Sequence, residues 1–162
     1  MRSSRSSSII ALLLLACAPQ SSTPVPQDEL RGSWRITEHT TTVDSQSVTY
    51  TNPQPSLVIF AEPNHYSMMY VPGEQPRIMF AVPSAPTDSE MVAAYEPFVA
   101  NSGRYTRVGD TVVIHPIVAK NPNFMAGDSQ VIAIRLLGDT LWLTTTGGFA
   151  ATGDIRRLER VR

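Results

Sequence analysis

The chain has 162 residues, of which 13 are basic and 14 acidic, and its formal net charge at pH 7 is −1. The two signs are interspersed along the sequence, so no basic stripe is available for a nucleic acid and we expect no nucleic-acid partner. Cys17 is the single cysteine, which excludes an intrachain disulfide and leaves the core as the source of stability.

The N-terminus has the pattern of an export signal. Arg2 and Arg5 precede the unbroken apolar run Ile9–Ala16, which is far shorter than the roughly 20 residues that span a bilayer as a helix. The segment LLAC, which ends at Cys17, resembles a bacterial lipobox. We therefore predict a lipoprotein signal peptide over residues 1–17, with Cys17 as the lipidation site and as the membrane anchor. An ordinary signal peptide with a chance cysteine is the alternative.

Residues 18–29 are rich in proline, serine and glutamine, a composition typical of a flexible tether. Ala18 follows the cysteine where an aspartate would retain a lipoprotein at the inner membrane, so we expect the periplasmic face of the outer membrane. The remaining residues, 30–162, are enough for one domain. Without Arg2 and Arg5, 11 basic residues face 14 acidic ones, so the processed chain is near −3.

Short runs of β-branched and aromatic residues, bounded by turn residues, predict strands along most of the domain. Two pairs of runs are joined by Gly-Asp, at Gly109-Asp110 and Gly138-Asp139, which favours tight hairpins because glycine adopts positive φ without strain. The predicted strands cover residues 32–38, 56–61, 65–71, 77–82, 103–108, 111–119, 130–137, 140–145 and 154–161.

One segment has helical periodicity. Thr87 and Glu90 form a capping box, in which each side chain satisfies a free backbone donor of the other. Pro97 should end or kink the helix near Glu96, because proline lacks the amide hydrogen. We expect the apolar face of this helix to dock on the barrel as an end plug or a lid. That face consists of Met91, Val92, Tyr95, Phe98 and Val99.

Eight or nine short strands joined mostly by tight turns predict an all-β protein. We favour an up-and-down antiparallel barrel of about eight strands, with one short helix inserted before the hairpin of residues 103–119. A β-sandwich is the alternative. Closure favours the barrel because it removes the free strand edges that otherwise promote aggregation.

Two stretches of the sequence resemble a known protein family. Gly32-Ser33-Trp34 is similar to the Gly-x-Trp opening of lipocalins, and the run from Ser102 to Gly127, with its Asn121-Pro122-Asn123 loop, resembles the bacterial lipocalin-like domains of the calycin group. The resemblance implies a barrel with a central cavity and no particular reaction. It gives Gly32 and Trp34 structural roles, with Arg157 or Arg160 lying over the indole.

An eight-stranded barrel can be filled by its own side chains or can hold one small ligand. Tyr66, Met68 and Tyr70 share one face of their strand, and with Tyr105 they could line a site for an apolar ligand. The alternative is that these side chains fill the interior.

Two titratable residues could give such a site a binding or catalytic role. An inward His115 could donate a hydrogen bond or act as a general base; otherwise it is a structural histidine. An inward Arg135 would favour a carboxylate-bearing ligand, because guanidinium pairs bidentately with a carboxylate; otherwise it is a surface residue. Gln130 lies five residues before Arg135, so at most one of the two can face the cavity.

Several other sites are not expected. The three histidines lack metal-ligand spacing, and neither a Gly-x-Ser-x-Gly elbow nor a P-loop is present, so we expect no metal and no cofactor. The leading hypothesis is a lipid-anchored binding protein for a small, largely apolar molecule, without catalysis. The alternatives are a cavity enzyme of the isomerase or cyclase type with His115 as base, and a structural or inhibitory envelope lipoprotein that acts through its outer surface.

Overall fold

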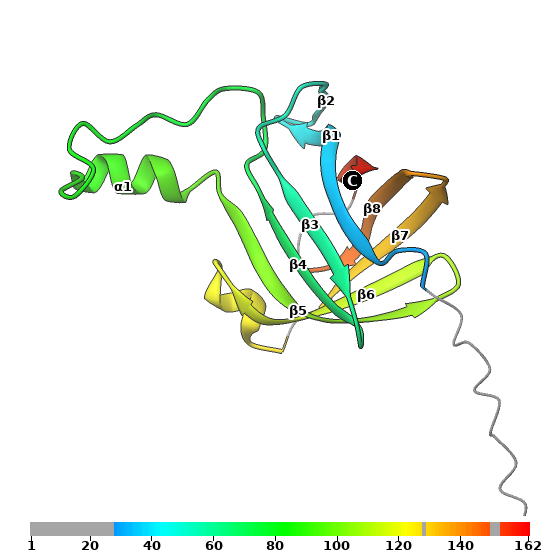
Figure 1. Ribbon diagram of the computed structural model, residues 1–162. Helices are drawn as coiled ribbons and strands as arrows, with labels where there is room; N and C mark the ends of the chain where they lie inside the picture. Colours follow the sequence, from blue (N-terminus) through cyan, green and yellow to red (C-terminus); the bar gives the residue numbers. More distant parts are fainter. Residues whose placement is uncertain (1–27, 128, 150–152) are drawn as a thin grey trace, which may run out of the picture.

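The computed structural model describes residues 28–127, 129–149 and 153–162 (Figure 1). The predicted lipobox and most of the tether lie outside these residues. Within them the chain forms nine strands, one α-helix and one 3-10 helix. Their bounds are β1 Gly32–Val43, β2 Gln46–Tyr50, β3 Leu57–Ala61, β4 His65–Tyr70, α1 Asp88–Tyr95, β5 Val99–Val108, β6 Thr111–Ala119, η1 Pro122–Met125, β7 Gln130–Leu137, β8 Thr140–Gly148 and β9 Ile155–Arg160.

The strands form one antiparallel sheet that closes on itself. β1 pairs with β3, and each strand from β3 to β8 pairs with the next along the chain. β9 pairs back to β1, with Trp34 opposite Arg160 and Ile36 opposite Leu158. The short strand β2 pairs with the distal part of β1. The ring therefore has eight strands, which confirms the predicted all-β, up-and-down barrel with one helix.

Both predicted Gly-Asp turns are present. Gly109 and Gly138 each have φ of +58°, the left-handed conformation that glycine adopts most readily. A third glycine, Gly103, has a different role, because a Cβ atom there would lie 2.1 Å from the carbonyl oxygen of His115 on the neighbouring strand. The sheet is bulged at this point, and only glycine allows so close an approach of the two backbones.

The helix begins and ends as its sequence predicts. Thr87 accepts a hydrogen bond from the amide of Glu90, and the Glu90 carboxylate accepts one from the amide of Thr87. The prediction of a strand at residues 77–82 is wrong. Since β4 and β5 pair directly with each other, the sheet has no free edge there to take an additional strand, and the segment is irregular.

The helix does not dock on the barrel, so the predicted end plug or lid is also wrong. Residues 71–98 form an arm that projects beyond the strands (Figure 1), and α1 buries none of its side chains. Polar contacts hold its C-terminal end instead. Lys120 donates hydrogen bonds to the carbonyls of Tyr95 and Glu96, and Arg77 donates one to the carbonyl of Ala94. Cations at a helix C-terminus are favourable for the unpaired carbonyls and the helix dipole.

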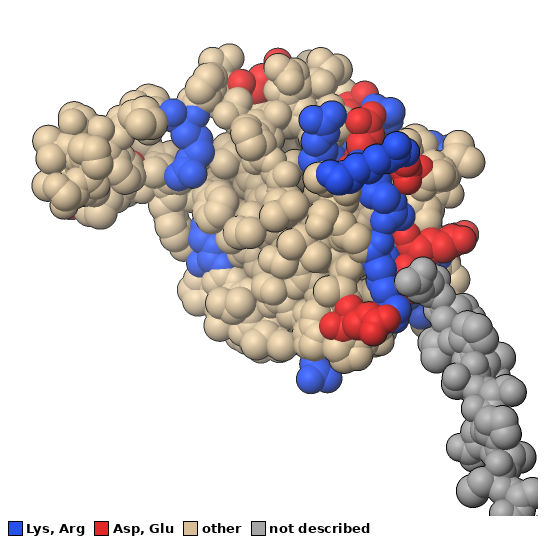
Figure 2. All heavy atoms as spheres, in the orientation of Figure 1, with Lys and Arg blue, Asp and Glu red and all other residues tan. Residues whose placement is uncertain are grey.

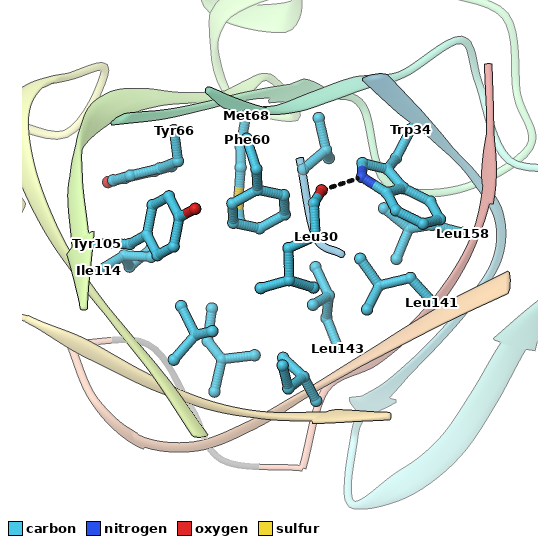
Figure 3. Packing of buried hydrophobic residues seen from close by; sticks show 14 of the residues in the cluster. Leu30, Trp34, Phe60, Tyr66, Met68, Tyr105, Ile114, Leu141, Leu143 and Leu158 are labelled. Atoms are coloured by element: carbon cyan, nitrogen blue, oxygen red, sulfur yellow. Dashed lines mark hydrogen bonds between the residues drawn. The ribbon is translucent and has the colours of Figure 1, made fainter. Parts of the chain in front are cut away.

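The end of the barrel near Trp34, which we call the closed end, is sealed by residues that precede β1. Leu30 and Trp34 are both completely buried, and the indole nitrogen of Trp34 donates to the carbonyl of Leu30 over 2.8 Å (Figure 3). The guanidinium of Arg160, rather than that of Arg157, lies 4.1 Å above the indole ring. Arg160 also donates to the carbonyls of Glu29 and Arg31. A Cβ atom at Gly32 would meet this guanidinium at 2.6 Å.

The half of the barrel next to this closure is filled by side chains. Phe60 and Tyr105 meet edge to face, with ring centroids 5.2 Å apart, a favoured aromatic geometry. Figure 3 shows Leu30 pointing into the centre of this group. The other members of the core here include Ile36, Val58, Tyr66, Val112, Ile134, Leu141, Leu143 and Leu158.

We predict that Leu30→Ala lowers the free energy of unfolding by about 2–5 kcal/mol, because it leaves a void in a packed interior. Leu137→Ala is the matched control, since Leu137 is 71% exposed beside a hairpin turn and its loss should change stability by less than about 0.5 kcal/mol. Urea unfolding followed by tryptophan fluorescence measures both. Equal stabilities of the two variants would show that Leu30 does not seal the barrel.

Asp28 fixes the chain where it enters the closed end. Its carboxylate accepts hydrogen bonds from the Tyr105 hydroxyl over 2.7 Å, from Arg107 over 2.7 Å and from the amide of Leu30. Burial alone would raise the pKa of Asp28, but these hydrogen bonds and the charge of Arg107 outweigh burial and hold the pKa below its usual value. Burial and the neighbouring Asp28 also raise the pKa of Tyr105 to about 12.

The lowered pKa of Asp28 predicts a pH-dependent contribution to stability. A carboxyl with a lower pKa in the folded state stabilises the fold above its unfolded pKa, near 4, and this contribution is lost as the pH falls through the folded value. Asp28→Asn should therefore lower the urea midpoint at pH 7 more than at pH 3. Asp110→Asn, at an exposed hairpin turn, should not show this difference. A pH-independent effect of Asp28→Asn would contradict the assignment.

Candidate functional site

The opposite half of the barrel is not filled. A cavity of about 350 Å³ lies there, where the arm, η1 and the end of β8 come together. This volume is within the range of roughly 300–1,000 Å³ that small-molecule sites occupy. Its wall is mostly apolar and includes Met68, Phe98, Val99, Ile114, Phe124 and Ile132. Phe124 of η1 stacks on Phe149, with ring centroids 4.7 Å apart, at the edge of this space.

Four predicted ligand-site residues lie inside the barrel, but they are not all in the cavity. Met68 and Tyr70 line it. Tyr66 and Tyr105 are buried in the filled half, where the Tyr105 hydroxyl donates a hydrogen bond to Asp28. The hydroxyl of Tyr66 has no hydrogen-bond partner in the described part of the chain, and burial raises the pKa of Tyr66 well above its usual value.

His115 and Arg135 lie on the outside of the barrel, so the suggestion that they face a ligand is wrong. His115 is exposed next to the buried Ile114, as the alternation of a strand requires. Arg135 is exposed as well and lies 3.8 Å above the ring of Trp142 on the outer wall. Gln130, on the opposite face of the same strand, is buried and lines the cavity.

Apart from Tyr70, the polar part of the cavity comes from residues that the sequence analysis did not select. We define the polar cluster as His39, Tyr70, Thr145, Asp154 and Arg156, all of which line the cavity. Arg156 connects two strands across the barrel, because its guanidinium donates to the Tyr70 hydroxyl over 3.2 Å and to the Thr145 hydroxyl over 2.6 Å. Its side chain is also near the Tyr70 ring, at 5.8 Å from the centroid.

Asp154 is held by the neighbouring strand β1. One carboxylate oxygen accepts a hydrogen bond from Thr41 over 2.6 Å, and the other lies 3.8 Å from Nε2 of His39. The imidazole of His39, then Thr41 and the charge of Arg156, outweigh burial and hold the pKa of Asp154 below its usual value. Asp154 is therefore ionised at neutral pH.

Several buried polar atoms of this wall have no hydrogen-bond partner among the described residues. They are Nδ1 of His39, Nε of Arg156 and the side-chain oxygen of Asn101. Nε2 of His39 makes no hydrogen bond within 3.5 Å either, but it faces the Asp154 carboxylate at 3.8 Å. An unpaired buried polar group costs roughly 1–3 kcal/mol, and such groups usually have a partner such as an ordered water or a ligand. The residues that carry them all line one cavity, which makes this space the candidate functional site.

The described residues contain neither a metal-binding cluster nor a membrane-spanning helix. No group of three or more potential ligands could hold a metal ion there. Among the described helices, none is long and apolar enough to cross a membrane.

Comparison with a family model agrees with the closed barrel. A model of the lipocalin-like domain family matches residues 31–158, and the chain belongs to this family. No curated protein matches the chain. It is similar to the crystal structure of an uncharacterised protein from Bacteroides eggerthii, with 11% identity and a TM-score of 0.45, over 82% of this chain and all of that one. Membership of the family suggests ligand binding in general.

Proposed function

We propose that this protein is an exported, lipid-anchored lipocalin-like protein that binds a small, largely apolar molecule in its cavity. The observation that carries the proposal is the division of the barrel into a filled half and a half with a cavity of about 350 Å³. Apolar burial of this kind supplies most of the affinity for such ligands. The proposal assigns no reaction to the protein, because His115, the expected base of an enzymatic alternative, lies outside the barrel.

Export and anchoring are proposed from the sequence. Arg2, Arg5, the apolar run Ile9–Ala16 and Cys17 support a lipidated N-terminus, and Ala18 supports the periplasmic face of the outer membrane. The first described residues, at Asp28, are fixed at the closed end by Tyr105 and Arg107. This point of attachment is at the end of the barrel opposite the cavity.

A blocked cavity tests the proposal. Val99 lines the cavity at the first position of β5, whereas Val108, the last residue of the same strand, is exposed at the other end. Val99→Trp should reduce the affinity for the neutral probe N-phenylnaphthylamine at least tenfold, because the indole fills the space. Val108→Trp is the matched control and should bind as the parent does.

Both variants are made in a Cys17→Ser chain, which cannot be acylated and so needs no detergent, and probe fluorescence is titrated. Thermal unfolding confirms that each is folded. Failure of the parent chain to bind the probe, together with the absence of any retained lipid in native mass spectrometry, would overturn the proposal.

One observation favours a second candidate, in which the outer surface contacts another envelope protein. The arm exposes six large apolar side chains, and Figure 2 shows few charged side chains on its helix, whereas acidic and basic residues are intermixed on the barrel. Contiguous exposed apolar surface often marks an interaction site. The six residues are Ile78, Met79, Val82, Met91, Val92 and Tyr95.

A photoreactive amino acid at Met79, which is 85% exposed, tests this candidate in living cells. A discrete adduct of one mass from position 79, and none from the exposed position of Leu137, is the expected result. The same weak background from both positions would remove the arm as a docking surface, and it would leave the proposal of a ligand in the cavity unaffected.

A further inference from the structure

We propose that the polar cluster binds the carboxylate of an amphiphilic ligand, with Arg156 supplying the positive charge and with Tyr70 and Thr145 donating hydrogen bonds. This inference rests on the proposed function, because it assigns the head group of the molecule that the cavity would hold. It assigns to Arg156 the carboxylate-binding role that the sequence analysis suggested for Arg135.

The first argument is the state of Arg156. Its side chain is only 7% exposed, yet its two hydrogen bonds go to neutral hydroxyls. No carboxylate of the described residues comes within ion-pair distance of it, since Asp154 is directed to Thr41 and His39 instead. A buried guanidinium is costly unless it is paired with an anion. The cavity wall therefore has a buried guanidinium that makes no direct ion pair with a described residue, and an anionic ligand would supply that pair.

The second argument concerns the hydroxyl groups. Tyr70 and Thr145 each accept a hydrogen bond from Arg156, so the hydroxyl hydrogen of each remains free to donate to a third group. The cluster thus offers two hydroxyl donors beside one positive charge, which suits a group that only accepts hydrogen bonds, as an ionised carboxylate does.

The charges around the cluster decide between a carboxylate and a phosphate. Among the described residues, Arg156 is the one arginine on the cavity wall, and the nearby Lys120 donates its hydrogen bonds to the carbonyls of Tyr95 and Glu96 at the end of the helix. Asp154 is ionised, because its pKa is lowered, and it opposes any additional negative charge. A phosphate monoester carries about −1.5 to −2 charges at neutral pH. A single cation beside an acidic residue matches the single charge of a carboxylate better.

The apolar part of the cavity wall determines which kind of chain the ligand can carry. Met68, Ile114 and Ile132 are buried and line the same cavity, so an aliphatic chain attached to the carboxylate would be desolvated by them. The volume of about 350 Å³ is near the lower end of the range for small-molecule sites. A carboxylic acid of medium chain length fits these limits better than a long-chain lipid.

The test compares decanoate with decanol, which has the same chain without the charge, by calorimetry in the Cys17→Ser chain. The parent should bind decanoate at least tenfold more tightly than decanol. Arg156→Gln should weaken decanoate about 10- to 100-fold, as expected for hydrogen bonds to a charged group, and should leave decanol unchanged. Arg135→Gln is the matched control, because this arginine lies on the outer wall, and it should alter neither affinity.

Each outcome has a distinct meaning. Equal affinities of the parent for decanoate and decanol, or equal effects of Arg156→Gln on both, would overturn the carboxylate assignment and leave the proposed function standing. Failure of the parent to bind decanoate, decanol and N-phenylnaphthylamine would overturn both. If circular dichroism shows that Arg156→Gln is unfolded, the variants Tyr70→Phe and Thr145→Val test the carboxylate assignment instead. Each removes one neutral donor and should weaken decanoate alone by about 2- to 10-fold.

Discussion

The contact between Leu30, Trp34 and Arg160 is the constraint on which the rest of the barrel depends. It joins the chain before β1 to the end of β9, because the Trp34 indole donates to Leu30 while Arg160 covers the ring and binds two carbonyls of the entering segment. A sheet closes into a barrel only if its first and last strands pair in register. This contact fixes that register at the closed end, where no disulfide assists it.

Sealing one end has a consequence for the other. With Leu30, Phe60 and Tyr105 filling the closed half, the fold has enough buried apolar surface to tolerate a cavity and several unpaired polar atoms in the other half. Such groups cost stability, and proteins commonly accept this cost at sites of function. Among the described residues, the buried Arg156 is hydrogen-bonded to neutral hydroxyls alone, and it is the group to which the proposed carboxylate site gives a use.

The sequence analysis located the barrel but missed most of the site, for reasons visible in the strands. In β1, counting by alternation from Trp34 through Ile36 places His39 on the outside, but the register shifts between Ile36 and Glu38 and turns His39 inward. A single bulge reverses the face of every later residue. For His115 the strand is apolar on both faces, so no pattern could orient it. The inward orientation of Arg156 could have been predicted, because alternation along the strand places it on the same face as Leu158 and Arg160.

Local chemistry in the sequence determined the strands of the barrel, its Gly-Asp turns and the capped helix, because β-propensity, positive φ and capping depend on near neighbours. The tryptophan closure was implied by the resemblance of Gly32-Ser33-Trp34 to a family motif. The tertiary structure alone decided that the helix projects from the barrel, that residues 77–82 find no strand partner, and that β1 and β9 bring His39 and Asp154 together. Those outcomes depend on strand register and on which edges are already paired, and both are set by residues far apart in the chain.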